Sequence, residues 1–196
     1  MNDVYNMKKS ITIFTVFLVI ATSLHAYETM QEKTPVGEIK ILKLPARLAL
    51  EADSQTSYFQ ADNGLFRKLF RYINAKGVSM TTPVEAEINP GKMRFFVGKG
   101  DRLKNINSTT EVKVKKIPPV VVLAIGIRGS YSENRFRENE KLLISQIKIN
   151  KEYEAIGKAY AVYWNGPFVP GFLKRSEVHL PIRKKNELKQ KTKVEI

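Results

Sequence analysis

The sequence predicts an α+β fold: a distorted antiparallel β-barrel or sheet made of two pseudo-symmetric β-α-β-β halves and flanked by two α-helices. Two observations support this prediction. Each half of the chain holds one stretch with helical spacing, and each such stretch follows one extended segment and precedes two others. Strands of such halves pair into one antiparallel sheet with the helices outside. No residue-level repeat accompanies this order, so the halves are expected to share architecture and not sequence.

Composition fits a single folded domain with a strong positive charge. The 196 residues are 43% hydrophobic and 27% charged, which is ordinary for a globular protein. The net charge of +14 has two interpretations, a lysine-covered soluble surface or attraction to an anionic partner. The absence of cysteine excludes a lipidated cysteine anchor, a thiolate nucleophile and thiolate metal ligands.

Residues 1–26 are typical of a cleaved signal peptide. Lys8 and Lys9 precede an uncharged run over 10–24, which is shorter than the roughly 20 apolar residues that span a bilayer. Ala26 offers a small residue for cleavage. We therefore expect an exported protein, periplasmic or extracellular.

The first half begins after a polar stretch. Residues 27–35 predict a flexible leader, and the folded domain is expected over 36–182. The alternation in 39–49 predicts a half-buried strand broken at Pro45, and 50–57 predicts a connection.

The first helix is predicted from Phe66, Leu69, Phe70 and Ile73, which recur at helical spacing, and Gly77 ends it. The polar residues just before it, 62–64, are suited to capping. A turn at Asn89-Pro90-Gly91 then predicts a hairpin of strands at 80–88 and 93–97.

The second half repeats this order. Ser132 predicts the start of a helix over 133–149. The expected strands are 111–116, 120–127, 158–164 and 176–181. The tail, 183–196, is basic and predicted to be disordered.

No catalytic constellation is present, so an enzyme is not expected. His179 is the only histidine after the signal segment, and the chain has no HExxH, GxSxG or P-loop spacing. Specific nucleic-acid binding is not expected either. Phe66 and Phe70 fit the core stripe of a helix better than a stacking surface for bases.

Aromatic and basic side chains together suit a flat apolar ligand that carries carboxylates. The candidate site residues are Phe66, Arg67, Phe70, Arg71, Met80, Tyr163 and Phe172. The same residues are equally compatible with a hydrophobic core and a solvated charged surface.

The chain resembles the SOUL haem-binding family in an ordered set of short motifs. These are Tyr72-Ile73, Met80-Thr81-Thr82-Pro83-Val84, Phe95-Phe96, Tyr163 with Pro167 and Pro170, and Arg175-Ser176-Glu177-Val178. The resemblance implies a barrel-like sheet of two halves and non-enzymatic binding of haem or another tetrapyrrole in an apolar cleft beside the first helix.

Carried onto this chain, the resemblance places Phe66 and Phe70 in the wall of that cleft, with Arg67 or Arg71 for the propionates and Met80 nearby. The chain departs from the family pattern at Ser176, where asparagine is usual, and at His179, where an aromatic residue is expected. His179 is therefore a hypothetical iron ligand.

Two other functions stay open. One is an effector-type binding domain for other flat hydrophobic ligands. The other is a basic module that binds an anionic membrane surface and has no haem role.

Overall fold

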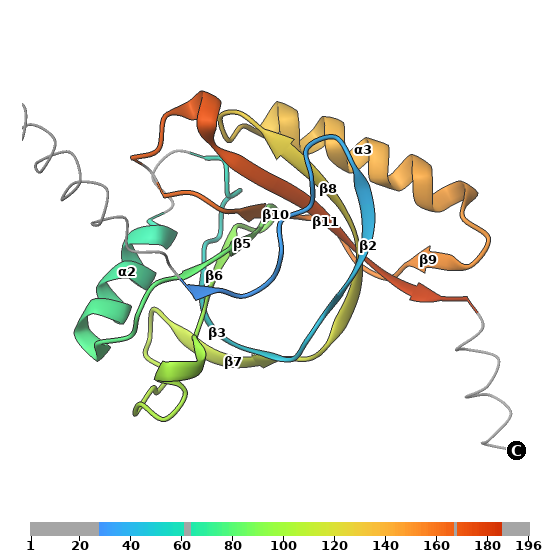
Figure 1. Cartoon of the computed structure of the whole chain (residues 1–196). Helices are drawn as coiled ribbons and strands as arrows, with labels where there is room; N and C mark the ends of the chain where they lie inside the picture. Colours follow the sequence, from blue (N-terminus) through green and yellow to red (C-terminus); the bar gives the residue numbers. More distant parts are fainter. Residues whose placement is uncertain (1–27, 61–63, 167, 186–196) are drawn as a thin grey trace, which may run out of the picture.

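A computed structural model describes residues 28–60, 64–166 and 168–185 of the chain (Figure 1). The predicted signal peptide, 1–26, lies outside these residues, as does most of the tail, 183–196. The described residues form a curled antiparallel sheet with two helices outside the curl, which confirms the predicted α+β class.

The elements follow the chain in two runs. The first-half strands are β1 (Glu28–Thr29), β2 (Ile39–Leu44), β3 (Arg47–Asp53), β4 (Thr81–Thr82), β5 (Val84–Glu87) and β6 (Lys92–Phe96). The second-half strands are β7 (Lys113–Ile117), β8 (Val120–Arg128), β9 (Tyr153–Ala155), β10 (Tyr160–Tyr163) and β11 (Arg175–Lys184). The helices are α2 (Leu65–Lys76) and α3 (Glu133–Ile149), with short 3-10 turns η1 (Lys99–Asp101) and η2 (Gly171–Leu173).

The order of the strands shows the two halves. The main sheet runs β2-β8-β11-β10-β5-β6-β3-β7, with β9 paired to β11, and all of its pairs are antiparallel. Outward from the central β10–β5 pair, β10-β11-β8 on one side matches β5-β6-β3 on the other. The remaining strand of the first half, β2, pairs with β8 of the second half. The remaining strand of the second half, β7, pairs with β3 of the first half. Each half therefore supplies the edge strand that pairs with the other half.

Strand β3 differs from the sequence-based expectation. The sequence predicts a connecting segment over 50–57, but β3 continues to Asp53. Its acidic side chains pair with cations on the neighbouring strands: Glu51 with Arg94 at 2.7 Å and Asp53 with Lys113 at 3.0 Å. In the main sheet the first half is therefore β-β-α-β-β, one strand longer than predicted, because the strand expected over 39–49 is two strands, β2 and β3.

Local sequence signals set the ends of the helices. Gly77 ends α2 in the left-handed conformation, with φ of 61°, as predicted. Gly64, also left-handed, precedes the first turn, and the other predicted capping positions, 62–63, lie outside the described residues. Ser132 caps α3, because its hydroxyl accepts a hydrogen bond from the Arg135 N–H at 3.4 Å.

Both helices cover the outer face of the sheet. α2 packs against β3 and β6, and α3 packs against β8, β9 and β11. The residues that they bury are Leu65, Leu69, Tyr72 and Ile73 of α2 and Phe136, Leu143 and Ile147 of α3. Neither helix in the described ranges is long and apolar enough to cross a membrane.

The inner face of the sheet carries buried charge. Arg47 donates to Glu85 at 2.6 Å, and the two side chains are only 2% and 4% exposed. Arg94 donates both to Glu51 and to Glu87. An isolated charge in such a position costs several kcal/mol, so each member of this group depends on its partners.

A second polar group, around Glu177 on β11, holds the segment before β2. Its carboxylate accepts hydrogen bonds from the Thr34 N–H at 2.9 Å, the Thr34 hydroxyl at 2.7 Å and Trp164 Nε1 at 2.7 Å. It also lies 2.8 Å from His179 Nε2. In the described part of the predicted leader, 28–35, Thr34 is thus hydrogen-bonded to the domain and β1 pairs with β4.

Replacing Glu177 with alanine should lower the free energy of unfolding by about 3–5 kcal/mol, because Thr34 and His179 would lose a buried partner. The matched control is Glu154→Ala, since Glu154 pairs with Arg183 where both side chains are over one-third exposed. That change should cost less than about 1 kcal/mol. Urea unfolding measures both, and equal losses would contradict the assignment.

Low pH should reduce the stability that the hydrogen-bonded group around Glu177 contributes. Burial raises the pKa of the Glu177 carboxyl, but hydrogen bonds from His179 and Thr34 outweigh burial and hold that pKa below its ordinary value. The stabilisation is therefore present above the unfolded-state pKa of about 4.3 and is lost as pH falls through the lower folded-state pKa. Unfolding free energy measured as pH falls should drop more steeply for the natural protein than for Glu177→Gln. Parallel pH profiles would refute this.

Candidate functional site

The outward side of α2 carries an aromatic pair. Phe66 and Phe70 stack with ring centroids 5.7 Å apart and ring planes only 14° apart. Phe66 also packs edge-on against Phe95 of β6 at 5.4 Å, while Phe70 is 44% exposed. The helical spacing explains this division, since Leu69 and Ile73 take the inward positions and are buried. The pair is a flat apolar surface anchored on the core.

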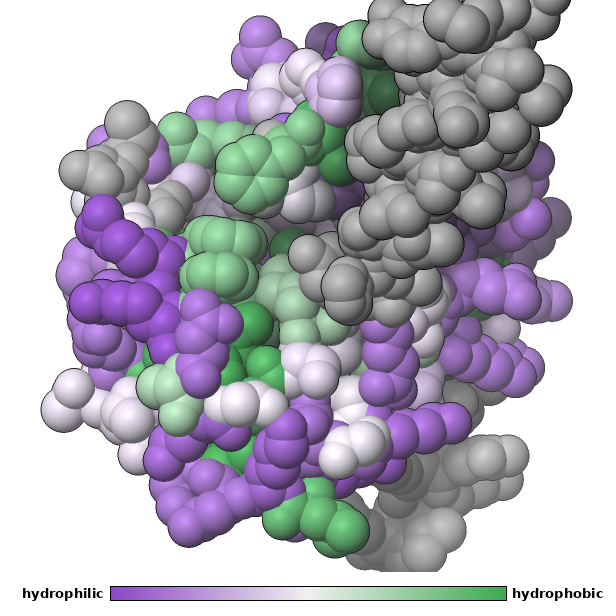
Figure 2. Space-filling model, turned by 60° about the vertical axis from the view of Figure 1, so that its left-hand side comes forward, coloured by the Kyte–Doolittle hydropathy of each residue, from purple (hydrophilic) through white to green (hydrophobic). Residues whose placement is uncertain are grey.

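Two arginines flank this surface. Arg67 and Arg71 are exposed on the same helix, one residue after each phenylalanine. Arg71 pairs with Glu111 at 3.4 Å, with both side chains more than half exposed. Such a pair contributes less than about 1 kcal/mol, so Arg71 can exchange partners readily. Figure 2, which turns the α2 side forward, shows hydrophobic side chains gathered at the middle of this face, with hydrophilic ones to the left of them and below them.

Tyr163 belongs to a different aromatic group. It is 5% exposed, and its ring lies 4.2 Å from Tyr131 and 5.7 Å from Tyr58 between centroids. Burial raises the pKa of both Tyr58 and Tyr131 to about 12, so these hydroxyls stay protonated at neutral pH. Tyr163 thus packs in the core between the halves.

The remaining predicted site residues lie on separate segments. Met80 is half-buried against the outer core just before β4, and Phe172 on η2 is 73% exposed. The structure therefore brings four predicted residues together on α2, namely Phe66, Arg67, Phe70 and Arg71. Met80 lies between α2 and β4, Tyr163 is the last residue of β10, and Phe172 lies on η2.

His179 lies on the inner face of β11, whereas α2 covers the outer face. It is 0% exposed, its ring centroid is 5.4 Å from that of Tyr160, and its Nε2 lies against Glu177. Its Nδ1 has no hydrogen-bond partner among the described residues. Within those residues, no group of three or more His, Asp or Glu side chains could hold a metal ion.

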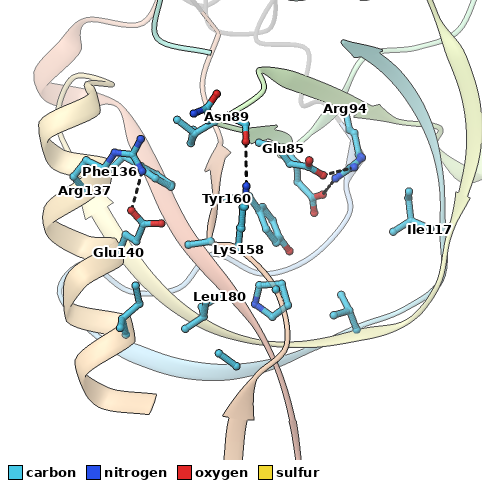
Figure 3. Close-up of a pocket in the computed structure, with 18 of the residues that line it drawn as sticks. Glu85, Asn89, Arg94, Ile117, Phe136, Arg137, Glu140, Lys158, Tyr160 and Leu180 are labelled. Atoms are coloured by element: carbon cyan, nitrogen blue, oxygen red, sulfur yellow. Dashed lines mark hydrogen bonds and ion pairs between the residues drawn. The ribbon is translucent and has the colours of Figure 1, made fainter. Parts of the chain in front are cut away.

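A cavity of about 870 Å³ opens where β5 and β10 part (Figure 3). The two strands pair only as far as Ala86 and Ala161, and the residues beyond this point line the cavity. Its apolar lining includes Ile88, Ile117, Val120, Phe136, Ile144 and Leu180, and its polar lining includes Arg47, Glu85, Glu87, Asn89, Arg94, Arg137, Glu140, Lys158 and Tyr160.

Sequence reasoning missed this cavity. Its walls come from α3, the β5–β6 turn, the β7–β8 turn and the stretch before β10. The turn signals at Asn89-Pro90-Gly91 and Pro118-Pro119 were visible, but nothing local shows that the two turns face one space. Burial and the charge of Glu85 raise the pKa of Tyr160 well above its usual range, so its hydroxyl stays protonated.

Comparison with solved structures shows what the fold is similar to. The EcmrR protein in its DNA complex with RPo is 12% identical, with 93% of this chain and 68% of that chain covered and a TM-score of 0.61. The EcmrR C-terminal domain is 14% identical, with 75% and 98% covered and a TM-score of 0.55. A hydrolase from Listeria innocua is 12% identical, with 76% and 94% covered and a TM-score of 0.52. At these identities the likeness shows the fold alone.

Sequence comparison gives the family. No protein with a curated description matches the chain. The profile of the SOUL heme-binding proteins matches residues 24–181, which includes both helices and most of the sheet. The chain therefore belongs to the SOUL heme-binding protein family.

Proposed function

We propose that this chain binds haem or a related tetrapyrrole, without catalysing a reaction, on the outward face of α2. The observation that carries the proposal is the exposed stack of Phe66 on Phe70 with Arg67 and Arg71 beside it. A tetrapyrrole is flat and apolar on its faces and carries acids at one edge. Membership of the SOUL heme-binding family supports this choice of ligand.

The chemistry of each side chain determines which part of the ligand it contacts. Phe70, which is 44% exposed, loses water-accessible apolar surface when a flat ring covers it. Arg67 and Arg71 donate to the ligand's carboxylates, and the fixed fork of a guanidinium suits two oxygens at once. Arg71 would exchange Glu111 for a propionate, at little cost because that pair is exposed.

The residues on this face fit a tetrapyrrole held by its ring faces and acids, independently of its iron. Haem, when bound, adds an iron centre with its own redox and ligand chemistry. The one described histidine, His179, is buried on the other face of the sheet. We therefore expect haem and a metal-free porphyrin to bind with similar affinity, and His179→Ala to leave the Soret spectrum of bound haem unchanged.

We also propose that the protein is exported. The support is the sequence of residues 1–26, where a basic start, an apolar run and a small residue follow one another. Recovery of the mature chain from the periplasm or medium, with a new N-terminus near residue 27, would test this.

Phe70→Ala should weaken haem and metal-free porphyrin binding about three- to tenfold, because an aromatic contact contributes about 0.5–1.5 kcal/mol beyond its buried area. Absorbance titration of the purified protein measures both affinities. Leu142→Ala, at a 51% exposed position on α3, is the matched control and should change neither. Unchanged affinities in Phe70→Ala would remove the α2 face as the site.

Replacing Arg67 and Arg71 together with glutamine should weaken porphyrin dicarboxylate binding about tenfold at low salt, since two charge-assisted hydrogen bonds are lost. The dimethyl ester of the same porphyrin should be insensitive to the change. Lys141→Gln with Lys148→Gln, two exposed cations on α3, controls for net charge. Equal losses for the acid and the ester would show that the arginines do not bind the carboxylates.

A further inference from the structure

The cavity beside α3 is separate from the face of α2. Its volume of about 870 Å³ lies in the range of small-molecule pockets, roughly 300–1,000 Å³, and no residue of α2 lines it. Figure 3 shows Arg137 and Glu140 entering from α3, Glu85 and Arg94 from the opposite side, and Tyr160 between them. A ligand here would not touch Phe66 or Phe70.

The charges that line the cavity favour an anion. Four lining side chains are cationic, namely Arg47, Arg94, Arg137 and Lys158, and three are acidic, namely Glu85, Glu87 and Glu140. Each of the three carboxylates has an arginine partner. Lys158 donates only to the Asn89 carbonyl, at 3.5 Å, in the contacts described, and Figure 3 shows this bond at the centre of the view. A cationic ligand would find no carboxylate without a partner.

Arg47 provides a second, independent observation. Arg47 is 4% exposed, and its Cζ lies 4.3 Å from the centroid of the Phe96 ring. One guanidinium nitrogen donates to Glu85. Its Nε has no hydrogen-bond partner among the described residues. The Tyr160 hydroxyl also lies against this guanidinium. A guanidinium does not lose its proton in proteins, so the buried Nε donor is open to an acceptor that enters the cavity.

Apolar side chains make the rest of the wall. Ile117 and Val120 lie at the β7–β8 turn, Ile88 follows β5, and Ile144 and Leu180 come from α3 and β11. These surfaces suit a hydrocarbon or aromatic body, and the excess positive charge suits one acid group on it.

We propose that this cavity binds a small apolar molecule with a single carboxylate, such as an aromatic or medium-chain monocarboxylic acid. The carboxylate accepts from the Arg47 Nε and lies in the field of Lys158, while the apolar body packs against Ile117 and Val120. This site is independent of the tetrapyrrole site and stands whether or not a porphyrin binds to α2.

Calorimetric titration of the full chain with 2-naphthoate and with decanoate tests the proposal. At least one of them should bind, 2-naphthamide should bind at least tenfold more weakly, and 2-naphthylmethylammonium should not bind. Failure of both acids to bind, or equal binding of the ammonium compound, would overturn the proposal.

Two kinds of variant locate the site. Ile117→Trp should fill the cavity and abolish acid binding, and Ala155→Trp, which narrows it from β9, serves the same purpose if the first variant does not fold. Lys158→Gln should weaken acid binding about three- to tenfold. Ile41→Trp on β2 lies outside the cavity and is the control. Acid binding that survives both cavity tryptophans, or that a porphyrin displaces, would show that the site lies elsewhere.

Discussion

Pairing of buried charge on the inner face of the sheet is the constraint on which the rest of the structure depends. Arg47 and Arg94 join β3, β5 and β6 through carboxylates, and Glu177 joins β11 to the segment before β2. A slip of one residue in any of these strands would turn its charges into the apolar outer core. Because an unpaired charge there is expensive, the inner face fixes the register. The outer face is then free to be uniformly apolar beneath the helices.

The parts of the fold that could be predicted from the sequence are those with local causes. The extent of α3 follows from the Ser132 cap and the apolar spacing after it, and α2 ends at Gly77 for reasons visible in the sequence. The later part of β3, residues 50–53, was not recognised because Glu51 and Asp53 look like loop residues until their partners are known. Those partners are 43 and 60 positions away in the chain, and only the sheet brings them together.

The candidate site also has residues that the sequence could group and residues that it could not. Phe66, Phe70 and their neighbouring arginines share α2, so helical spacing was enough to group them. Tyr163 could not be placed from the sequence, because its burial depends on Tyr58 and Tyr131, which come from different connections. The cavity beside α3 is set by where two paired strands separate, and no residue pattern records that point.

Strand β6 lies between the two proposed sites and limits how they can influence each other. Phe95 supports Phe66 on the outer face, and its neighbour Arg94 lines the cavity on the inner face. One ligand changes the affinity of the other only if the strand has two arrangements that the ligands favour differently. Arg94 forms ion pairs with Glu51 and Glu87, so a movement of its guanidinium would deprive both carboxylates of this partner. The ion pairs that fix the register therefore also keep the two sites independent.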